Sequence, residues 1–236
     1  MTYCNLETEQ TKYFREEFSF EEIKKWFDDL MEEYGKWATF QCEMKNQRQA
    51  SIKELDFPYE YRPGQKKLVS DVYRTIMRQK LLFMQAPTGV GKTISTIFPA
   101  VKAVGEELAD RIFYLTAKTI TATVAKETFA LLEKNGYRAK TIQITAKEKL
   151  CPCDEMECNP VTCPYAKGHF DRVNDAVFDL LHRCEMIERD DILSQAERYA
   201  RLNTALIFQA GRTGSSAITT MCLTRMFILR DFFRRG

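Results

Sequence analysis

The chain alternates between stretches in which apolar residues recur every three to four positions and short runs of consecutive apolar residues. The first pattern predicts amphipathic helices, and the second predicts buried strands. Strands are expected at 81–85, 111–116 and 141–145, and helices at 20–37, around 68–76, after residue 92, at 120–133 and at 170–181. Because strands alternate with helices, the sequence predicts an α/β fold with a parallel sheet covered by helices on both faces.

Signals at the helix ends support this prediction. Ser19 and Glu22 form a capping-box pattern before the first helix, and Asn135-Gly136 forms a C-cap after the helix at 120–133. The polar stretch 45–50 is interpreted as a soft boundary. The first helix carries an apolar stripe that favours packing against a partner surface over ligand binding. The stripe consists of Ile23, Trp26, Phe27, Leu30, Tyr34 and Trp37.

One loop indicates a ligand. Residues 86–93 read Ala-Pro-Thr-Gly-Val-Gly-Lys-Thr, between a predicted strand and a predicted helix, which is the layout of a phosphate-binding loop. Lys92 would contact the β- and γ-phosphates, and the Thr93 hydroxyl would bind Mg²⁺. Ala86 replaces the first glycine of the pattern but is small enough for the turn. The backbone N–H groups of four loop residues would point at phosphate oxygens. These residues are Thr88, Gly89, Val90 and Gly91. The alternative is an ordinary strand–turn–helix whose glycines serve only the turn.

Four of the eight cysteines are clustered. Their spacing is C-x-C-x4-C-x4-C, with prolines between them, which indicates a metal or iron–sulfur site in a reducing compartment. Paired C-x2-C knuckles of structural zinc are absent, so the pattern slightly favours iron–sulfur over zinc. Unligated thiols are the remaining alternative. His169 is a further potential ligand, but a surface or helix-start histidine is the favoured reading. The clustered cysteines are Cys151, Cys153, Cys158 and Cys163.

Composition narrows the class of protein. The 236 residues are 44% hydrophobic and 29% charged with a formal net charge of +2, which is typical of a soluble globular chain. The charge is too small to predict nucleic-acid binding by itself. Apolar runs fall short of a membrane span and the first residues lack a signal-peptide pattern, so we expect no membrane association and a cytoplasmic location.

The phosphate loop followed by the cysteine cluster resembles the iron–sulfur superfamily-two DNA helicases of the XPD and DinG kind. Three further segments agree with this resemblance. Residues 57–65 are similar to the family's adenine-side motif, 114–119 to its first DNA-contacting motif, and 145–151 to the segment that delivers the first cluster cysteine. The resemblance covers about residues 57–181, and it implies a RecA-like ATP-binding domain with an inserted iron–sulfur segment.

The resemblance also implies roles for individual residues. Arg62 and Gln65 would contact the adenine end of ATP, while Thr116 and Lys118 would touch the backbone of single-stranded DNA. Three cysteines (Cys151, Cys158, Cys163) would ligate a [4Fe-4S] cluster. The family's fourth ligand lies further on, in a Cys-Pro-aromatic segment past the following helix. This chain has no such segment there, so Cys153 would stand in for it or the site would keep three ligands. Other basic residues would contact phosphates or form a solvated face: Lys66, Lys67, Lys126, Lys147 and Lys149.

These assignments divide the chain into four regions. Residues 1–50 would be an N-terminal helical extension, 51–150 the first part of the RecA-like domain, 151–201 the iron–sulfur segment, and 202–236 an atypical tail. The expected function is that of an ATP-dependent DNA helicase acting on single-stranded or forked DNA, with ATP, Mg²⁺ and the cluster as cofactors and the cluster segment as a wedge. Protein partners are not predicted.

Two parts of a helicase are missing from the sequence. No apolar strand ending in Asp-Glu-x-His follows the cysteines, and there is no second RecA-like domain. The chain alone is therefore expected to hydrolyse ATP very slowly, since Mg²⁺ and the attacking water lack an anchor. Two alternatives stay open: a P-loop ATPase or kinase with a structural zinc, and a non-enzymatic truncated fragment.

The tail shows neither the family pattern nor a clear periodicity. Codons can be chosen for 215–226 so that a shifted reading frame encodes the Asp-Tyr-Asn-Tyr segment that this family carries after its cluster. We therefore expect the tail to be a frame-shifted reading of a longer helicase gene, in which Met1 would be an internal residue. The encoding nucleotide sequence tests this expectation.

Overall fold

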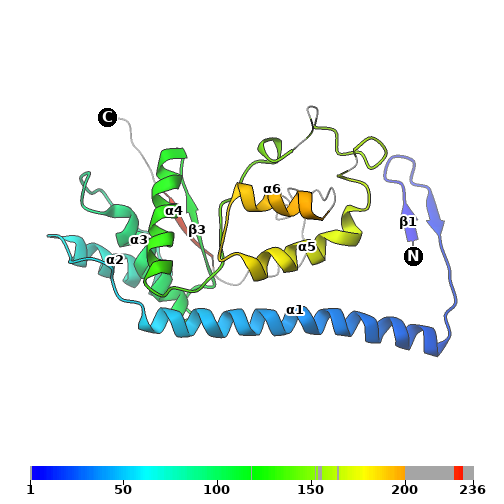
Figure 1. Cartoon of the computed structure of the whole chain (residues 1–236), viewed down its shortest axis with the longest axis horizontal. Helices are drawn as coiled ribbons and strands as arrows, with labels where there is room; N and C mark the ends of the chain where they lie inside the picture. Colours follow the sequence, from blue (N-terminus) through cyan, green and yellow to red (C-terminus); the bar gives the residue numbers. More distant parts are fainter. Residues whose placement is uncertain are drawn as a thin grey trace. The chain divides into compact units, whose positions relative to one another are not determined.

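The computed structural model describes residues 2–117, 119–151, 153, 156–163, 165–199 and 226–230. The chain divides into two compact units, Met1–Cys42 and Glu43–Gly236. The first unit contains an antiparallel hairpin of β1 (Thr2–Cys4) and β2 (Thr11–Tyr13), followed by the N-terminal part of helix α1 (Phe20–Glu54). Figure 1 shows α1 as one continuous helix that runs from the first unit into the second.

The start of α1 confirms the predicted capping box. The backbone N–H and the hydroxyl of Ser19 donate to Glu22 Oε2 at 2.8 and 2.9 Å, and the Glu22 N–H donates to Ser19 Oγ at 3.2 Å. Most of the apolar stripe behind it is exposed, with Trp26 63% and Tyr34 64% accessible, but Trp37 at its end is half-buried and packs edge-to-face on Phe40 at 6.5 Å. For the exposed part, from Ile23 to Tyr34, the predicted packing surface is not found among the described residues.

The predicted boundary at 45–50 does not interrupt α1, which continues to Glu54. Lysine, glutamine, arginine and alanine in this stretch are good helix formers, and it contains no glycine or proline. Its first three residues face solvent, while Arg48 and Gln49 donate to the carbonyl oxygens of Asp110 and Val104 at 3.3 and 3.1 Å. The residues just beyond the stretch are buried. Ile52 and Leu55 are each 1% exposed and belong to the core of the second unit.

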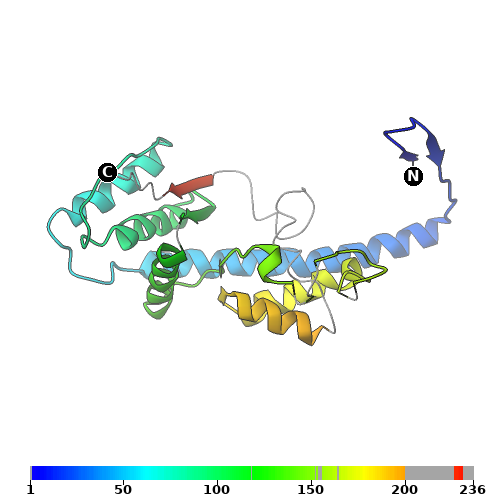
Figure 2. The ribbon, with the colours of Figure 1, turned by 90° about the horizontal axis from the view of Figure 1, so that it is seen from above.

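The second unit is built around helix α3 (Lys92–Gly105), which is buried along nearly its whole length. Helices α2 (Gln65–Met77) and α4 (Thr119–Lys134) pack against it, as the two views in Figures 1 and 2 show. The Asn135-Gly136 C-cap of α4 is confirmed, since Gly136 has φ 101° and the Tyr137 N–H donates to Leu132 O at 3.0 Å. One core cluster joins the end of α1 with α3 and α4, including Ile52, Leu55, Ile97, Val101, Leu132 and Tyr137, and a second joins Val72 and Ile76 of α2 with Ala100 and Ala103 of α3.

The strands of the second unit form two parallel pairs. Strand β3 (Arg111–Leu115) pairs with β6 (Met226–Arg230), and β4 (Thr141–Ile142) pairs with β5 (Met186–Ile187). Within the described residues these pairs do not join into one sheet, so the RecA-like sheet stays a prediction. Strand β6 lies in the tail where the sequence predicted no element; the rest of 202–236, including the segment of the frame-shift prediction, lies outside the described residues.

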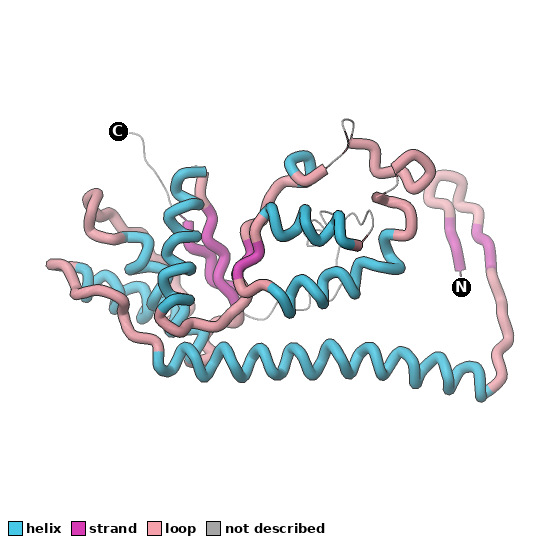
Figure 3. Tube along the Cα trace, viewed as in Figure 1, coloured by secondary structure: helices cyan, strands magenta, loops and turns pink. Residues whose placement is uncertain are grey.

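The strand predicted at 81–85 is not formed. Figure 3 draws this segment as loop, and Leu81 and Phe83 are 86% and 84% exposed. A strand requires ladder hydrogen bonds to a neighbour, and no described strand flanks this segment. The strand prediction at 81–85 is therefore wrong for the described structure, because the apolar pattern does not say whether a pairing partner exists.

The remaining elements are a single 3₁₀ turn (Lys147–Lys149) and helices α5 (His169–Arg183) and α6 (Arg189–Arg198). Helix α5 confirms the helix predicted at 170–181. Gln195 on α6 is fully buried and donates to Ala176 O and Asp179 Oδ2 on α5, each at 2.9 Å. A membrane-spanning segment is not found among the described helices, since each is too short or too polar.

Candidate nucleotide-binding site

The glycines of the phosphate loop (residues 86–93) adopt a backbone conformation that favours glycine. Gly89 and Gly91 adopt φ of 87° and 76°, in the left-handed region that residues with a Cβ rarely adopt. Gly91 is the N-cap of α3, and its carbonyl accepts the first helical bond from the Ser95 N–H at 3.1 Å. Lys92 and Thr93 therefore occupy the first turn of a buried helix, where unpaired N–H groups and the helix dipole favour an anion.

Gly91 is required for a second reason, which is the close approach of Gln65. A Cβ at position 91 would lie 2.7 Å from Gln65 Nε2. Gln65 is 4% exposed, and its Oε1 accepts a bond from the Arg62 N–H at 3.0 Å. The side chain of Gln65 thus connects the turn before α2 to the back of the phosphate loop.

Two cations also contact the loop. Arg62 Nη1 donates to the carbonyl oxygen of Gly89, and Lys92 Nζ donates to the carbonyl oxygens of Ala86 and Pro87 at 3.0 and 3.3 Å. The structure therefore brings together Arg62, Gln65, the two loop glycines and Lys92, which the sequence analysis assigned to one site. Arg62 and Gln65 contact the loop itself rather than a position beyond it.

An aromatic surface lies just before these residues in the chain. Phe57 and Tyr61 stack with ring centroids 4.3 Å apart, and Phe57 also packs edge-to-face on Phe98 of α3 at 5.2 Å. Burial, with the nearby Asp56 carboxylate, raises the pKa of Tyr61. This stack fixes the start of the 57–65 segment on α3, which in turn positions Arg62.

The predicted DNA-contacting residues are only partly described. Thr116 is half-buried and follows directly after the carboxyl end of β3, whereas Lys118 lies outside the described residues. Among the other basic residues, Lys67 pairs with Asp71 at 2.7 Å and Lys126 pairs with Glu188 at 2.6 Å. These two lysines therefore have carboxylate partners within the chain.

The cysteines of the cluster differ in exposure. Cys163 is 7% exposed, and Cys151, Cys153 and Cys158 are half-buried. Desolvation, together with interactions with the Cys163 and Cys151 thiols, raises the pKa of Cys153, which indicates that these three thiols are neighbours. Soft thiolate donors fit iron or zinc, but no three His, Cys, Asp or Glu side chains among the described residues form a group that could hold an ion. The donor chemistry therefore fits a metal centre, while the described arrangement is not a ready-made ligand group.

His169 was predicted to lie at the surface or at the start of a helix. It is the first residue of α5, but it is buried and does not lie at the surface. Its Nδ1 has no hydrogen-bond partner in the described structure. Burial, followed by the charge of Arg172, lowers the pKa of His169. Two acidic residues follow the cysteine segment, Asp190 and Asp191. Asp191 caps α6, since its Oδ2 accepts a bond from the Glu188 N–H at 2.9 Å, and Asp190 lies 3.5 Å from the Arg189 guanidinium.

Sequence reasoning missed a basic pocket at the other end of α2. Arg74, Arg78 and Lys80 line it, together with residues of the extended segment that leads to the phosphate loop. The available signal was a run of basic residues at the end of the predicted helix, with Arg74 on the helix and Arg78 and Lys80 just beyond it.

Comparison with models of protein families, with curated proteins and with solved structures finds no match to this chain. The function is therefore inferred from the residues of the chain and their geometry.

Proposed function

We propose that this chain is the ATP-binding first part of the motor domain of an iron–sulfur DNA helicase. Residues 86–93 would bind the triphosphate of Mg²⁺-ATP, the 57–65 segment would contact its adenine end, and Thr116 with Lys118 would contact single-stranded DNA. Cys151, Cys158 and Cys163, with Cys153, would ligate a [4Fe-4S] cluster.

The phosphate loop is the observation that carries this proposal. Its two glycines are left-handed, its lysine begins a buried helix, and Gln65 and Arg62 contact it from the side. An ordinary strand–turn–helix does not require a buried glutamine against the N-cap glycine or two cations bonded to loop carbonyls. A bound triphosphate would offer Lys92 and Arg62 stronger, charged acceptors than the carbonyls they now contact.

ATP hydrolysis by this chain is proposed to be very slow. Asp190 and Asp191 cannot supply the missing acidic pair in this conformation, because Asp191 caps α6 and Asp190 lies 3.5 Å from the Arg189 guanidinium. Magnesium would be held by Thr93 and the phosphates, with water completing its octahedral shell. The chain is therefore proposed to bind nucleotide without turning it over efficiently.

Magnesium-dependent nucleotide binding tests the proposal. A fluorescent ATP analogue is titrated with and without Mg²⁺ into the native chain and into the Thr93→Ala and Thr93→Ser variants. We expect Mg²⁺ to tighten binding to the native chain and to Thr93→Ser, because both keep the hydroxyl, but not to Thr93→Ala. Equal Mg²⁺ dependence in all three proteins would contradict the role of Thr93.

Metal analysis of the purified chain tests the other half of the proposal. Iron with acid-labile sulfide and visible charge-transfer absorbance would support the helicase assignment. Zinc without iron would instead favour a P-loop ATPase or kinase with a structural zinc, and the helicase proposal would be abandoned.

A further inference from the structure

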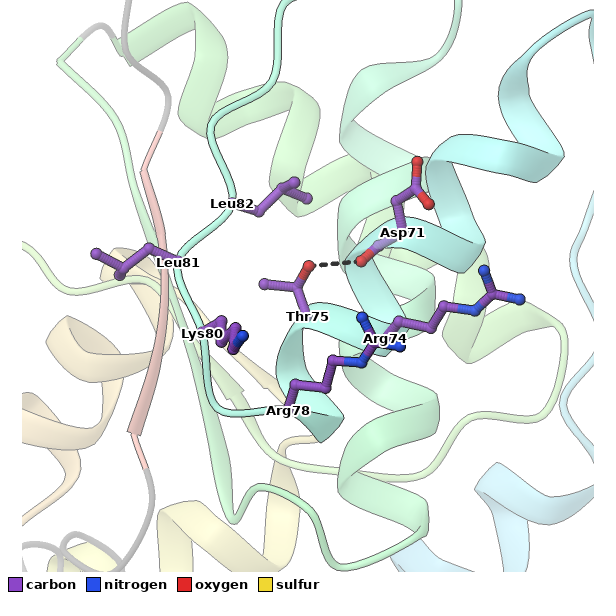
Figure 4. A pocket seen from close by; sticks show the side chains of 7 residues that line it. All are labelled: Asp71, Arg74, Thr75, Arg78, Lys80, Leu81 and Leu82. Carbon is purple, nitrogen blue, oxygen red and sulfur yellow. Dashed lines mark hydrogen bonds between the residues drawn. The ribbon is translucent and has the colours of Figure 1, made fainter.

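A pocket of about 250 Å³ lies at the C-terminal end of α2. Figure 4 shows the arginine side chains extending from α2 on one side of it, with Leu81 and Leu82 of the extended segment on the other. Asp71 and Thr75 complete the lining. The Thr75 hydroxyl donates to the Asp71 carbonyl at 2.7 Å, so it is satisfied within the helix.

Three cations at this pocket lack a partner. No hydrogen bond or ion pair connects the side chains of Arg74, Arg78 or Lys80 to another residue in the described part of the chain, and all three are exposed. The Asp71 carboxylate does not neutralise them, because it already pairs with Lys67 at 2.7 Å. The pocket therefore keeps a net positive charge.

The turn that positions Lys80 is strained. Gln79 adopts φ of 54°, in the left-handed region that glycine usually occupies at a helix C-terminus. The Lys80 N–H donates back to Thr75 O at 3.1 Å, and the Gln79 N–H donates to Ile76 O at 2.9 Å. This conformation costs a residue with a Cβ about 1–2 kcal/mol. It reverses the chain so that Lys80 lines the same pocket as the arginines of α2.

Helix-dipole stabilisation explains only part of this arrangement. The negative end of the helix dipole stabilises cations in the last turn, which accounts for Arg74 and Arg78. It does not account for Lys80, which lies beyond the helix in a strained turn, or for an open pocket between the cations and two leucines. A bound anion accounts for three cations that surround an open pocket and have no partner among the described residues.

We propose that this pocket binds the phosphodiester backbone of a nucleic-acid strand. Guanidinium groups bind phosphate oxygens through paired N–H donors and lysine adds a point charge, while Leu81 and Leu82 offer an apolar surface to sugar or base. The pocket is separate from the proposed ATP site, because Gln65 and Lys80 flank opposite ends of a 13-residue helix, about 20 Å apart. The choice of nucleic acid as the ligand rests on the proposed DNA-binding function.

The test uses fluorescence anisotropy of a labelled oligothymidylate with the full chain. The variant Arg74→Gln/Arg78→Gln/Lys80→Gln is compared with Lys12→Gln/Lys24→Gln/Lys25→Gln, which removes the same charge from exposed positions in the first unit. We expect the pocket variant to bind on the order of tenfold more weakly, with a salt dependence lower by about 2 in log–log slope. The matched control should bind like the native chain. Equal losses in both variants, or no loss in either, would overturn the proposal.

Two further measurements distinguish the loss of nucleic-acid binding from a folding defect and from binding of another anionic ligand. The single variant Lys80→Glu leaves the arginines of α2 in place and should also weaken oligonucleotide binding, which guards against a folding defect in the triple variant. If polyglutamate competes as strongly as unlabelled oligonucleotide, the pocket binds acidic protein segments and the nucleic-acid proposal is wrong.

Nucleotide binding separates this inference from the proposed function. ATP-analogue affinity should be unchanged in the pocket variant. A chain that binds no nucleotide but loses oligonucleotide affinity in the pocket variant would refute the proposed ATP site and leave the pocket assignment intact. Unchanged oligonucleotide affinity in the pocket variant, with normal nucleotide binding, would refute only the pocket.

Discussion

The phosphate loop and the cysteine segment (residues 151–163) are both short loops of the second unit, but their described residues differ in how they are arranged. The loop has left-handed Gly89 and Gly91, the buried amide of Gln65 behind it, and Lys92 bonded to its carbonyls. In the cysteine segment, three thiols are neighbours, yet no described group could hold an ion.

The difference follows from how each site is built. A phosphate loop binds through backbone N–H groups whose direction is fixed once the glycines and the helix are in place. A thiolate site depends on side chains that repel one another when charged, so the ion itself supplies the free energy that brings them together. We therefore predict that changes to the backbone of the phosphate loop disrupt nucleotide binding, and that the cysteine site forms only when its metal is bound.

Removing a buried cysteine should have the largest effect. Cys163→Ser replaces the least exposed thiol of the segment, and we expect it to retain little of the iron that the native chain takes up on anaerobic reconstitution with iron and sulfide. The measurement is iron per chain with the visible absorbance. Cys42→Ser, which changes an exposed cysteine on α1, is the control and should keep full iron content. Equal iron in both variants would remove Cys163 from the ligand set.

Gly91→Ala should disable the nucleotide site while leaving the cysteine segment unchanged. The left-handed φ of 76° costs about 1–2 kcal/mol of stability for alanine, and the new Cβ would push Gln65 away from the loop. We expect nucleotide affinity to fall at least about tenfold, measured by titration with a fluorescent ATP analogue. Gly35→Ala is the control: its Cβ meets nothing within 4 Å and it lies inside α1, so it should not weaken the protein.

Gly105→Ala should lower stability without affecting nucleotide affinity directly. Its Cβ would lie 2.3 Å from Ile52 Cγ2, at the end of α3 opposite the phosphate loop. Overpacking of this kind costs about 1–3 kcal/mol, measurable by urea denaturation. Adding Ile52→Ala removes the clash, so the double variant should be more stable than the sum of the two single changes predicts. Additive losses would show that the two residues do not touch.

The smallest effect concerns pH. Burial raises the pKa of Tyr137 from 10.0 to about 12. The folded state therefore holds this proton more tightly than the unfolded state, and the stability it contributes is present below pH 10 and lost as pH rises toward 12. We expect the native chain to lose roughly 1 kcal/mol more than Tyr137→Phe between pH 9 and pH 11. Parallel stability curves for the two proteins would contradict the burial of the hydroxyl.

The sequence predicted local features well and pairing poorly. The capping box at Ser19 and the C-cap at Gly136 depend on neighbouring residues, and each is found where it was predicted. The segment 81–85 and the apolar stripe of α1 depend on partners far along the chain, and apolar periodicity does not say whether a partner exists. Strand β6 was missed for the same reason, since its pairing with β3 joins segments more than a hundred positions apart.

The basic pocket shows a further limit of sequence reasoning. Lys67 and Arg74 are both basic residues of α2, but Lys67 has Asp71 as a partner and Arg74 has none among the described residues. Counting charges along the chain does not separate such residues. Only the side-chain geometry shows which cations are available to a ligand.

The most direct test of the account is ATP binding by Lys92→Ala. Isothermal titration with Mg²⁺-ATP is performed on the native chain, on Lys92→Ala and on Lys134→Ala, an exposed lysine at the end of α4 that serves as the matched control. We predict that the native chain and Lys134→Ala bind with the same affinity and that Lys92→Ala binds at least about tenfold more weakly, because it loses the charged contact to the phosphates. Unchanged ATP affinity in Lys92→Ala, or no binding by the native chain, would contradict the assignment of residues 86–93 as an ATP site.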